Sequence, residues 1–246
     1  MVVGFVGSGN MAAAIARGWV GEFEQMLFSD SGSGRARALA EELGGEVASN
    51  AEIASRADLA LLAVKPNKLE DVAGELKEAK EVASVLAATP LERLRAALPG
   101  AEHVLRVMPN VAVEVRQGVL CVAGSASEEA RAKLELLGHV VELGEGDFDA
   151  ATAVMGCSPA YLALAVEAIA DAGAADGLDP RLARELVVET AVGTAELLRH
   201  HDPAALRKAV ASPGGSTEKG LEALDREGAR EAFAAAVEAS LEKMRG

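Results

Sequence analysis

Short apolar runs alternate with longer amphipathic segments along the chain up to Gly146. One run, Leu59–Val64, has no polar alternation, as expected for a strand buried on both faces. The predicted strands are Val2–Val6, Met26–Ser29, Leu59–Val64, Val82–Leu86, Val104–Met108, Val119–Val122 and Val140–Leu143. The predicted helices between them are Gly34–Leu43, Asn67–Lys77 and Glu128–Leu137. Strand–helix alternation predicts an α/β fold with a mostly parallel sheet and helices on both of its faces.

The pattern changes after Gly146, where only helical periodicity remains. The predicted helices are Phe148–Met155, Pro159–Gly173, Pro180–His200, Pro203–Val210, Thr217–Glu227 and Ala229–Arg245. The pairs Ser158-Pro159 and Asp179-Pro180 are typical helix starts, because Pro is favoured at the first helical position. We therefore expect two domains, residues 1–146 with the sheet and residues 147–246 with helices alone.

The helix YLALAVEAIADAGAA (161–175) is apolar over most of its circumference. Such a helix is buried on more than one side, which one small helical domain can hardly achieve, so we expect an oligomer interface. The longest uncharged stretch, Ala150–Val166, is shorter than the roughly 20 residues that span a bilayer. Gly156 and Pro159 also interrupt it, so no membrane span and no membrane partner are expected.

Composition narrows the function classes. The chain has 246 residues, 24 Lys and Arg against 38 Asp and Glu, and a net charge of −14, which disfavours nucleic-acid binding. Half of the residues are hydrophobic, which excludes disorder as the main state. The two cysteines form no disulfide framework, and no His, Cys and Asp residues have metal-ligand spacing. The N-terminus has no basic region typical of a signal peptide, so we expect a cytoplasmic protein.

The first strand leads directly into Gly7-x-Gly9-x-x-Ala12 and a helix with Met11 on one face. Gly7 allows a tight turn, Gly9 lets the backbone approach a pyrophosphate, and Ala12 lets the helix pack on the strand. A tight turn in some other α/β protein is the alternative, but the position between strand and helix favours a dinucleotide site. The predicted pyrophosphate contacts here are Gly7, Gly9 and the N–H groups at the start of the helix.

The second strand ends at Ser29-Asp30-Ser31, about 20 residues beyond the glycines, where the adenosine ribose is expected. The Asp30 carboxylate would accept a hydrogen bond from a ribose 2′-hydroxyl and favour NADH. Ser29, Ser31, Arg35 and Arg37 would instead hold the 2′-phosphate of NADPH if Asp30 turned away. The same cluster also has the composition of a helix cap. The sequence leaves the choice between NADH and NADPH open.

Three further loops follow predicted strands and should line one crevice with the glycine turn, because ligands bind beyond the carboxyl ends of parallel strands. Asn50 and Asn110 offer amide groups for a cofactor, although asparagines are equally common in turns. The three loops are Lys65-Pro66, Ala87-Ala88-Thr89 and Met108-Pro109-Asn110.

A second glycine loop, Ser212-Pro213-Gly214-Gly215-Ser216-Thr217, lies between two predicted helices of the second domain. Its backbone N–H groups and hydroxyls could hold a small carboxylate at a helix N-terminus. An ordinary cap with Ser216 or Thr217 as the N-cap residue is an equally good interpretation. No helical Lys is placed as a proton donor, which suits a substrate that already carries its proton, such as an imine.

Five motifs together resemble the pyrroline-5-carboxylate reductase family along the whole chain. They are GFVGSGNMAAAI (4–15), LAVKPN (62–67), MPN (108–110), SPAYLALAVEAIADAG (158–173) and ASPGGSTEKGLEAL (211–224), the last of which is the signature of the family. The resemblance implies a Rossmann-like N-terminal domain and a helical C-terminal dimerisation domain that interlocks with that of a partner. It also implies that dimers assemble further into decamers.

The resemblance further implies NAD(P)H-dependent reduction of 1-pyrroline-5-carboxylate to L-proline, the last step of proline biosynthesis. The resemblance places the nicotinamide near Ala87, Ala88 and the run Met108-Pro109-Asn110. The other cofactor contacts that it implies are Gly7, Ser8, Gly9, Asn10, Met11, Ser29, Asp30, Ser31, Asn50, Ala63, Val64, Lys65 and Pro66. Thr217 is expected to act in catalysis by hydrogen bonding to the ring nitrogen and assisting its protonation. The substrate contacts implied are Met108, Pro109, Gly214, Gly215, Ser216 and Thr217, with the glycine loop working against the cofactor of the partner.

The chain departs from the family at Ser31, where an Arg often grips the 2′-phosphate, at Val111, where a Thr is usual, and at Cys157. His200 or its neighbour replaces a glutamate found near the proline site in some members. Two alternatives remain: a β-hydroxyacid dehydrogenase-like oxidoreductase, which would use a helical Lys, and a nucleotide-sensing protein without catalysis. The sequence does not decide whether six-membered cyclic imines are accepted.

Overall fold

The computed structural model describes residues 1–245, and the chain forms two compact units. The first consists of Met1–Gly156 together with the end of the chain from Met244, and the second of Cys157–Lys243. The prediction places the domain boundary ten residues earlier, at Gly146. The segment after Gly146 lies with the first unit because Phe148 is fully buried there against Met108 and Cys121. The exact limit of the two domains stays a prediction.

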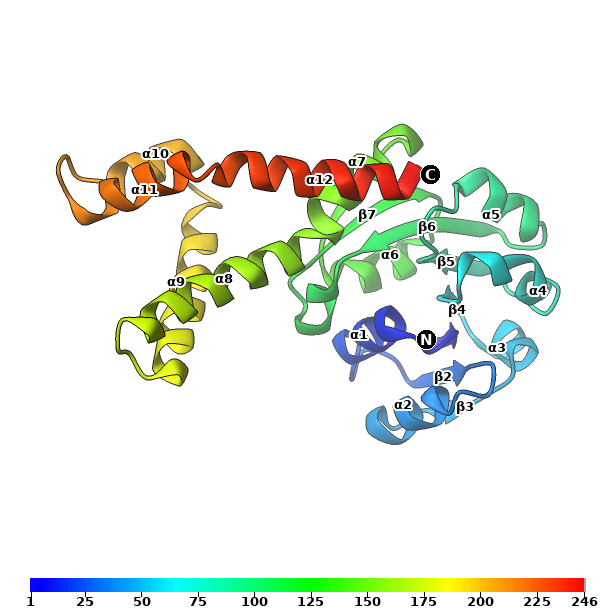
Figure 1. Ribbon diagram of the computed structural model, residues 1–246. Helices are drawn as coiled ribbons and strands as arrows, with labels where there is room; N and C mark the ends of the chain where they lie inside the picture. Colours follow the sequence, from blue (N-terminus) through cyan, green and yellow to red (C-terminus); the bar gives the residue numbers. More distant parts are fainter. Residues whose placement is uncertain (246) are drawn as a thin grey trace. The chain divides into compact units, whose positions relative to one another are not determined.

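An eight-stranded sheet with the order β3-β2-β1-β4-β5-β6-β7-β8 forms the centre of the first unit (Figure 1). The strands are β1 (Val2–Val6), β2 (Gln25–Ser29), β3 (Glu46–Val47), β4 (Leu59–Leu62), β5 (Glu81–Ser84), β6 (His103–Pro109), β7 (Gly118–Gly124) and β8 (Gly138–Glu142). Every neighbouring pair is parallel except β6 and β7, which are antiparallel. The predicted mostly parallel sheet is therefore confirmed, and the short edge strand β3 is the one that the prediction missed.

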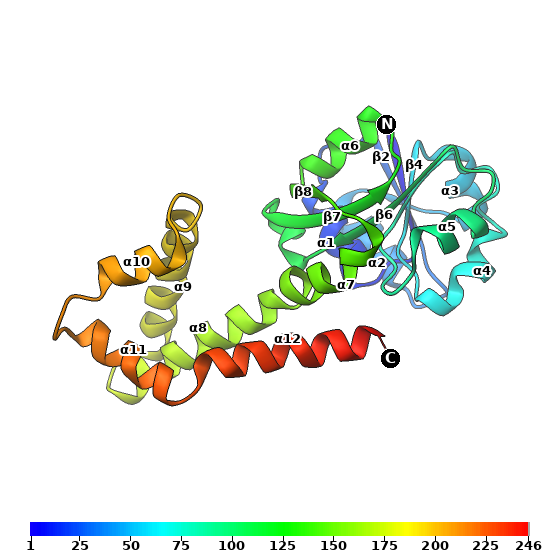
Figure 2. The same cartoon turned by 90° about the horizontal axis from the view of Figure 1, so that it is seen from above.

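Helices cover both faces of this sheet (Figure 2). They are α1 (Asn10–Gly18), α2 (Arg35–Leu43), α3 (Asn50–Arg56), α4 (Leu69–Ala73), α5 (Leu91–Ala97), α6 (Glu128–Glu135) and α7 (Phe148–Ala151). Short turns of 3₁₀-helix are η1 (Pro66–Lys68), η2 (Val111–Val115) and η3 (Glu145–Asp147), and η4 (Thr152–Gly156) is a π-helix. One core lies between the sheet and α1, α2 and α6, and the other between the sheet and α3, α4 and α5.

Aromatic packing joins α1 to the sheet on the first of these faces. The Phe5 and Phe28 rings stack with centroids 4.9 Å apart, and Trp19 is fully buried beside them. The Trp19 indole N–H donates to the Lys133 carbonyl at 2.7 Å, which ties α1 to α6. The few aromatic residues of the chain thus fix the helix that follows the glycine turn.

The second unit contains helices only, as predicted: α8 (Ser158–Ala175), α9 (Pro180–Leu197), α10 (Pro203–Val210), α11 (Ser216–Arg226) and α12 (Ala229–Arg245). Asp179 is the N-cap of α9 and accepts hydrogen bonds from the Arg181 and Leu182 N–H groups, which confirms that start. The Tyr161 hydroxyl lies 2.6 Å from Ser240 Oγ and joins α8 to α12.

Apolar side chains of the second unit remain largely outside its own core. Among its described residues only Ala170 and Ala183 are buried apolar side chains. The exposed large apolar residues on α8 and α9 are Leu162, Leu164, Ile169, Leu182, Leu186, Val188, Val192 and Leu197. A surface of this kind marks an interaction site, which agrees with the oligomer interface expected from the sequence.

One helical stretch, Glu145–Ala175, is longer than the uncharged segment Ala150–Val166 that the sequence analysis considered as a membrane span. It has 31 residues and includes an 18-residue window of mean hydropathy 1.6, of which 11% is buried. Length and composition alone would let such a helix cross a membrane. The stretch is not one regular helix, because the short elements η3, α7 and η4 precede α8 within it.

Candidate functional site

The β1–α1 turn has the geometry that the glycine pattern predicts. Gly7 adopts a φ of +99°, and a Cβ there would lie 2.7 Å from the Ala63 carbonyl oxygen, so only glycine fits. Gly9 is the N-cap of α1 and has no side-chain cap, while a Cβ at Gly9 would meet nothing within 4 Å. Open space above Gly9 and uncapped N–H groups at the start of α1 are the features that a phosphate needs.

A pocket of about 790 Å³ opens beside this turn, at the carboxyl ends of β1, β2 and β4. Ten predicted cofactor contacts meet there: Gly7, Ser8, Gly9, Ser29, Asp30, Ser31, Asn50, Ala63, Val64 and Lys65. The pocket is also lined by Arg35, which was expected only at a 2′-phosphate, and by six residues that were not predicted: Ser33, Ala48, Ser49, Lys68, Val72 and Glu75. The pattern Ser49-x-x-Glu52, a capping-box signature, could have revealed Ser49.

Hydrogen bonds within the pocket wall fix its polar groups. The Ser8 hydroxyl donates to the Ser29 carbonyl at 2.9 Å, and the Ser29 hydroxyl donates to Asn50 Oδ1 at 2.5 Å. Ser8 and Ser29 are both buried. Because Asn50 Oδ1 is an acceptor for Ser29, the amide NH₂ group of Asn50 remains available as a donor to a ligand.

Asp30 caps α2 instead of leaving its carboxylate free. Its Oδ1 accepts from the Gly32 N–H at 2.7 Å, and its Oδ2 accepts from the Ala36 N–H and the Ser33 hydroxyl, both at 2.9 Å. The hydrogen bond from Ala36 is the largest cause that lowers the pKa of Asp30, so the carboxylate is ionised at neutral pH. The capping interpretation therefore describes this cluster, while Arg35 lines the pocket beside it.

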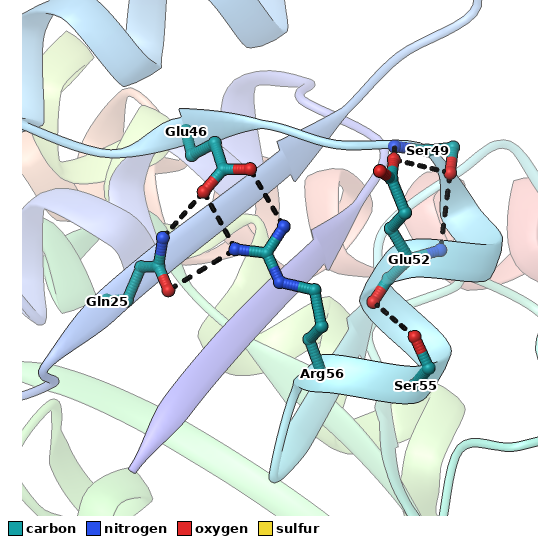
Figure 3. Close-up of polar contacts among 6 residues, drawn as sticks. All are labelled: Gln25, Glu46, Ser49, Glu52, Ser55 and Arg56. Carbon is teal, nitrogen blue, oxygen red and sulfur yellow. Dashed lines mark hydrogen bonds and ion pairs between the residues drawn. The ribbon is translucent and has the colours of Figure 1, made fainter.

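An ion-pair cluster supports the wall that carries Ser49 and Asn50 (Figure 3). Arg56 on α3 binds both carboxylate oxygens of Glu46 on β3, at 2.8 and 2.7 Å. This Arg56 hydrogen bond is the largest cause that lowers the pKa of Glu46. At the other end of α3, Ser49 and Glu52 form a complete capping box. The two-residue strand β3 is thus anchored by side chains, and it leads directly into the pocket.

Six predicted cofactor contacts do not line this pocket: Asn10, Met11, Pro66, Ala87, Ala88 and Asn110. The Asn110 amide makes contacts of its own, because Oδ1 accepts from the Val119 N–H and Nδ2 donates to the Met155 carbonyl, both at 3.2 Å. Met108 is buried against Phe148, and Pro109 pairs with Leu120 across β6 and β7. The roles of these residues toward a cofactor or substrate stay predictions.

The second glycine loop lies between α10 and α11 in the helical unit. Gly214 has a φ of +72°, and its N–H donates to Glu218 Oε2 at 2.7 Å. Gly215, not Ser216 or Thr217, is the N-cap of α11, so the ordinary-cap interpretation is wrong. No hydrogen bond of the Ser216 or Thr217 hydroxyl occurs within the described part of the chain, and both residues are exposed. The loop therefore presents two hydroxyls and a backbone N–H that already binds a carboxylate.

Residues 1–245 contain no group of three or more His, Cys, Asp or Glu side chains arranged to hold a metal ion. Cys121 is buried, which raises the pKa of its thiol, and Cys157 is half-buried.

Two family profiles match the chain. Pyrroline-5-carboxylate reductase dimerisation matches residues 145–246, and NADP oxidoreductase coenzyme F420-dependent matches residues 2–89. A pyrroline-5-carboxylate reductase of Synechocystis is 34% identical over 97% of this chain and 95% of its own length. One of Aquifex aeolicus is 35% identical over 93% of this chain and 90% of its own length.

Solved structures extend the likeness to the whole fold. A crystal structure of 1-pyrroline-5-carboxylate reductase from Streptococcus pyogenes has a TM-score of 0.85 and 31% identity, and covers 99% of this chain and 98% of that one. A pyrroline carboxylate reductase from Plasmodium falciparum with NADP bound has a TM-score of 0.85 and 27% identity, covering 99% and 97%. A 3-hydroxyisobutyrate dehydrogenase of Mycobacterium tuberculosis, at 18% identity and a TM-score of 0.52, shares the fold alone.

Proposed function

The chain belongs to the pyrroline-5-carboxylate reductase family, and we propose on that premise which of its residues carry the reaction. The protein is an NAD(P)H-dependent oxidoreductase that reduces 1-pyrroline-5-carboxylate to L-proline, the last step of proline biosynthesis. Matches to curated reductases over nearly the full length of both chains carry this conclusion.

The pocket at the glycine turn fits a dinucleotide. Open space at Gly9 and the uncapped start of α1 suit the pyrophosphate, and the NH₂ group of Asn50 suits a ribose or phosphate oxygen. Bound NAD(P)H supplies a hydride to C5 of the imine while the ring nitrogen gains a proton, which yields proline and the oxidised cofactor. We assign the pyrophosphate to Gly7–Met11 and the nicotinamide end to Ala87, Ala88 and Asn110.

We further propose that the protein prefers NADPH to NADH. Both Asp30 oxygens already accept hydrogen bonds from α2 and its preceding turn, so they are poorly placed to select a ribose 2′-hydroxyl. Ser31 and Arg35 line the same part of the pocket and are donors to a 2′-phosphate, whereas the Ser33 hydroxyl already donates to Asp30. Arg35 takes the place of the Arg that the family often has at Ser31.

The glycine loop is the proposed site of the substrate carboxylate. The Gly214 N–H already binds the Glu218 carboxylate at 2.7 Å, which supports the affinity of the loop for this group. The substrate would replace Glu218 there and reach the free hydroxyls of Ser216 and Thr217. Thr217 then hydrogen bonds to the ring nitrogen and assists its protonation. Gly215 completes the loop, and Met108 and Pro109 are assigned to the ring of the substrate.

Self-association follows from the dimerisation domain, and we propose its form. The exposed apolar faces of α8 and α9 would pack against those of a second copy, with the helical units interlocked. In this arrangement each glycine loop serves the cofactor of the partner, and dimers assemble into a decamer. The same packing would cover the apolar stretch Glu145–Ala175, and we propose that the protein is cytoplasmic.

One assay tests the activity. Purified protein is mixed with 1-pyrroline-5-carboxylate and either NADPH or NADH, and both cofactor oxidation and proline formation are measured. We expect one proline for each cofactor oxidised and a higher kcat/KM with NADPH. Cofactor binding without oxidation would contradict the reductase assignment and favour a sensing protein. Oxidation of 3-hydroxy acids in place of imine reduction would favour the dehydrogenase alternative.

A further inference from the structure

A buried cation lies in the first unit at a place that the cofactor pocket does not include. The Arg106 side chain on β6 is 5% exposed, and its Nη1 lies 2.6 Å from Glu145 Oε2. Its guanidinium carbon lies 4.1 Å from the centroid of the Phe148 ring. Arg106 Nε is buried and has no hydrogen-bond partner.

Stability alone is a poor explanation for this arrangement. Burial of the Arg106 guanidinium costs it solvation, and an apolar residue of similar volume often stabilises a core equally well or better, whereas the Glu145 side chain remains 39% exposed. The unpartnered Nε adds to the cost of burying Arg106. The Arg106 charge lies against two groups, the face of the Phe148 ring and the Glu145 carboxylate, and only the carboxylate continues the contact to another element.

Glu145 uses its second oxygen to hold the start of α5. Its Oε1 accepts from the Leu91 N–H at 3.3 Å, and Leu91 is the first residue of that helix. Pro90, the N-cap residue, makes no side-chain cap, so Glu145 satisfies an otherwise free N–H group. Arg106 itself pairs with Ser84 in the register of β5 and β6. The turn between Ser84 and Leu91 is therefore fastened at both ends next to Arg106.

This turn has an unusual backbone. Ala88 adopts a φ of +48°, a region that residues other than glycine seldom occupy. Ala87 and Ala88 are exposed, whereas Thr89 is fully buried and donates its hydroxyl proton to the Ala87 carbonyl at 3.0 Å. Such a conformation persists only where the surrounding structure fixes it, and the contacts at Leu91 and Thr89 do so.

We propose that Arg106 and Glu145 are positioning residues that set the Ala87–Ala88 turn against the nicotinamide through the Leu91 N–H group. The inference rests on the proposed function, because that assignment places the nicotinamide at Ala87 and Ala88. The pair touches neither cofactor nor substrate. It limits the movement of the turn, so that the nicotinamide ring is held at hydride-transfer distance from the imine.

The test separates the nicotinamide half of the cofactor from the adenosine half. Glu145→Gln keeps an oxygen for the Leu91 N–H but removes the charge that holds Arg106. We expect hydride transfer in a single turnover to slow about tenfold, with a larger isotope effect from deuterated NADPH. Affinity for 2′-phospho-ADP-ribose, which lacks nicotinamide, should stay within about twofold, because its contacts lie at β1 and β2.

Arg106→Met is the second variant, since it removes the buried charge and keeps the apolar volume. The double variant should lose no more than either single one, because the two residues act as one unit. Glu70→Gln is the matched control: Glu70 pairs with Arg93 of α5 at 2.7 Å, but this exposed pair does not reach the turn. Its single-turnover rate should equal that of the unaltered protein.

Three results would overturn the proposal: an unchanged hydride-transfer rate, a parallel loss of affinity for 2′-phospho-ADP-ribose, or failure of both variants to fold, as judged by circular dichroism. The last two would make the pair a purely stabilising contact. Failure of the proposed function looks different, because the unaltered protein would then transfer no hydride to the imine.

Discussion

The cofactor pocket and the glycine loop differ in how many of their polar side chains already form hydrogen bonds within the single chain. In the pocket, Ser8, Ser29 and Asn50 form a hydrogen-bonded series, and both Asp30 oxygens accept hydrogen bonds from α2 and the turn before it. In the loop, the Ser216 and Thr217 hydroxyls have no partner within the described residues. A preorganised site can form in a single chain, whereas the loop still has unused donors, which we propose are taken by the substrate.

The largest expected effect comes from a substitution in the exposed apolar surface of α8 and α9 in the helical unit. Leu164→Asp puts a charge on an apolar side chain of α8 that is 64% exposed in the isolated chain. We expect the dimer to dissociate and reductase activity to be lost, while NADPH still binds to the first unit. Light scattering with chromatography measures the assembly.

Leu136→Asp is the control for this variant, because Leu136 is an exposed leucine of the first unit. It should leave assembly and activity unchanged. An intact dimer in Leu164→Asp would show that this face of α8 is not the interface.

Thr217→Ala tests the loop itself. Loss of the hydroxyl that assists protonation should lower kcat about 100-fold, with NADPH affinity and the thermal midpoint unchanged. Steady-state kinetics with the imine measure the effect. Thr190→Ala is the matched control, because the Thr190 hydroxyl only donates to the Leu186 carbonyl within α9. Equal kinetics for both variants would remove Thr217 from the mechanism.

Arg35→Met tests whether Arg35 in the cofactor pocket binds the 2′-phosphate of NADPH. If Arg35 binds the 2′-phosphate, its loss should raise the KM for NADPH about tenfold, as for a charge-assisted hydrogen bond, and change the KM for NADH little. Arg37→Met serves as control, because Arg37 lies on the same helix but does not line the pocket. Equal changes with both cofactors would assign Arg35 to another part of the dinucleotide.

Glu218→Gln should have the smallest effect and the opposite sign. A neutral amide binds the Gly214 N–H more weakly than the carboxylate does, so the substrate would compete more easily for the loop. We expect the KM for the imine to fall about threefold, with kcat unchanged. Glu222→Gln is the control, since Glu222 pairs with Lys219 one turn further along α11. An unchanged KM would mean that Glu218 does not compete with the substrate.

The sequence predicted the parts of the fold in which local pattern and burial agree. The continuous apolar run at Leu59 and the glycine pattern at Gly7 each have one good structural solution, so β4 and the β1–α1 turn follow from them. The predicted helix Asn67–Lys77 is shorter in the structure, because η1 begins at Pro66 and α4 ends before Gly74. The edge strand β3 has two residues, too few to produce a pattern.

The sequence predicted the parts of the site that the backbone conformation defines. It did not predict the parts in which a side chain can form hydrogen bonds with alternative partners. Asp30 is suited equally to a ribose and to the N–H groups of α2, and only its conformation decides between them. The pairing of Arg106 with Glu145 joins residues far apart in the sequence and has no local signal. The hydrogen bond from Gly214 to Glu218 spans only four residues, but it depends on the conformation of the Glu218 side chain, which the sequence pattern does not define.

The scarcity of buried apolar side chains in the helical unit has a consequence for the newly synthesised protein. The nucleotide-binding half has its own interior, whereas the helical half carries the dimerisation domain and buries few apolar side chains, so we infer that the first half folds in the single chain and that the second is stabilised by a second copy. The stability of the folded helical half then depends on the concentration of the protein, so dilution or low expression destabilises this half first. The abundance of the protein in the cell therefore helps to set the lifetime of each molecule.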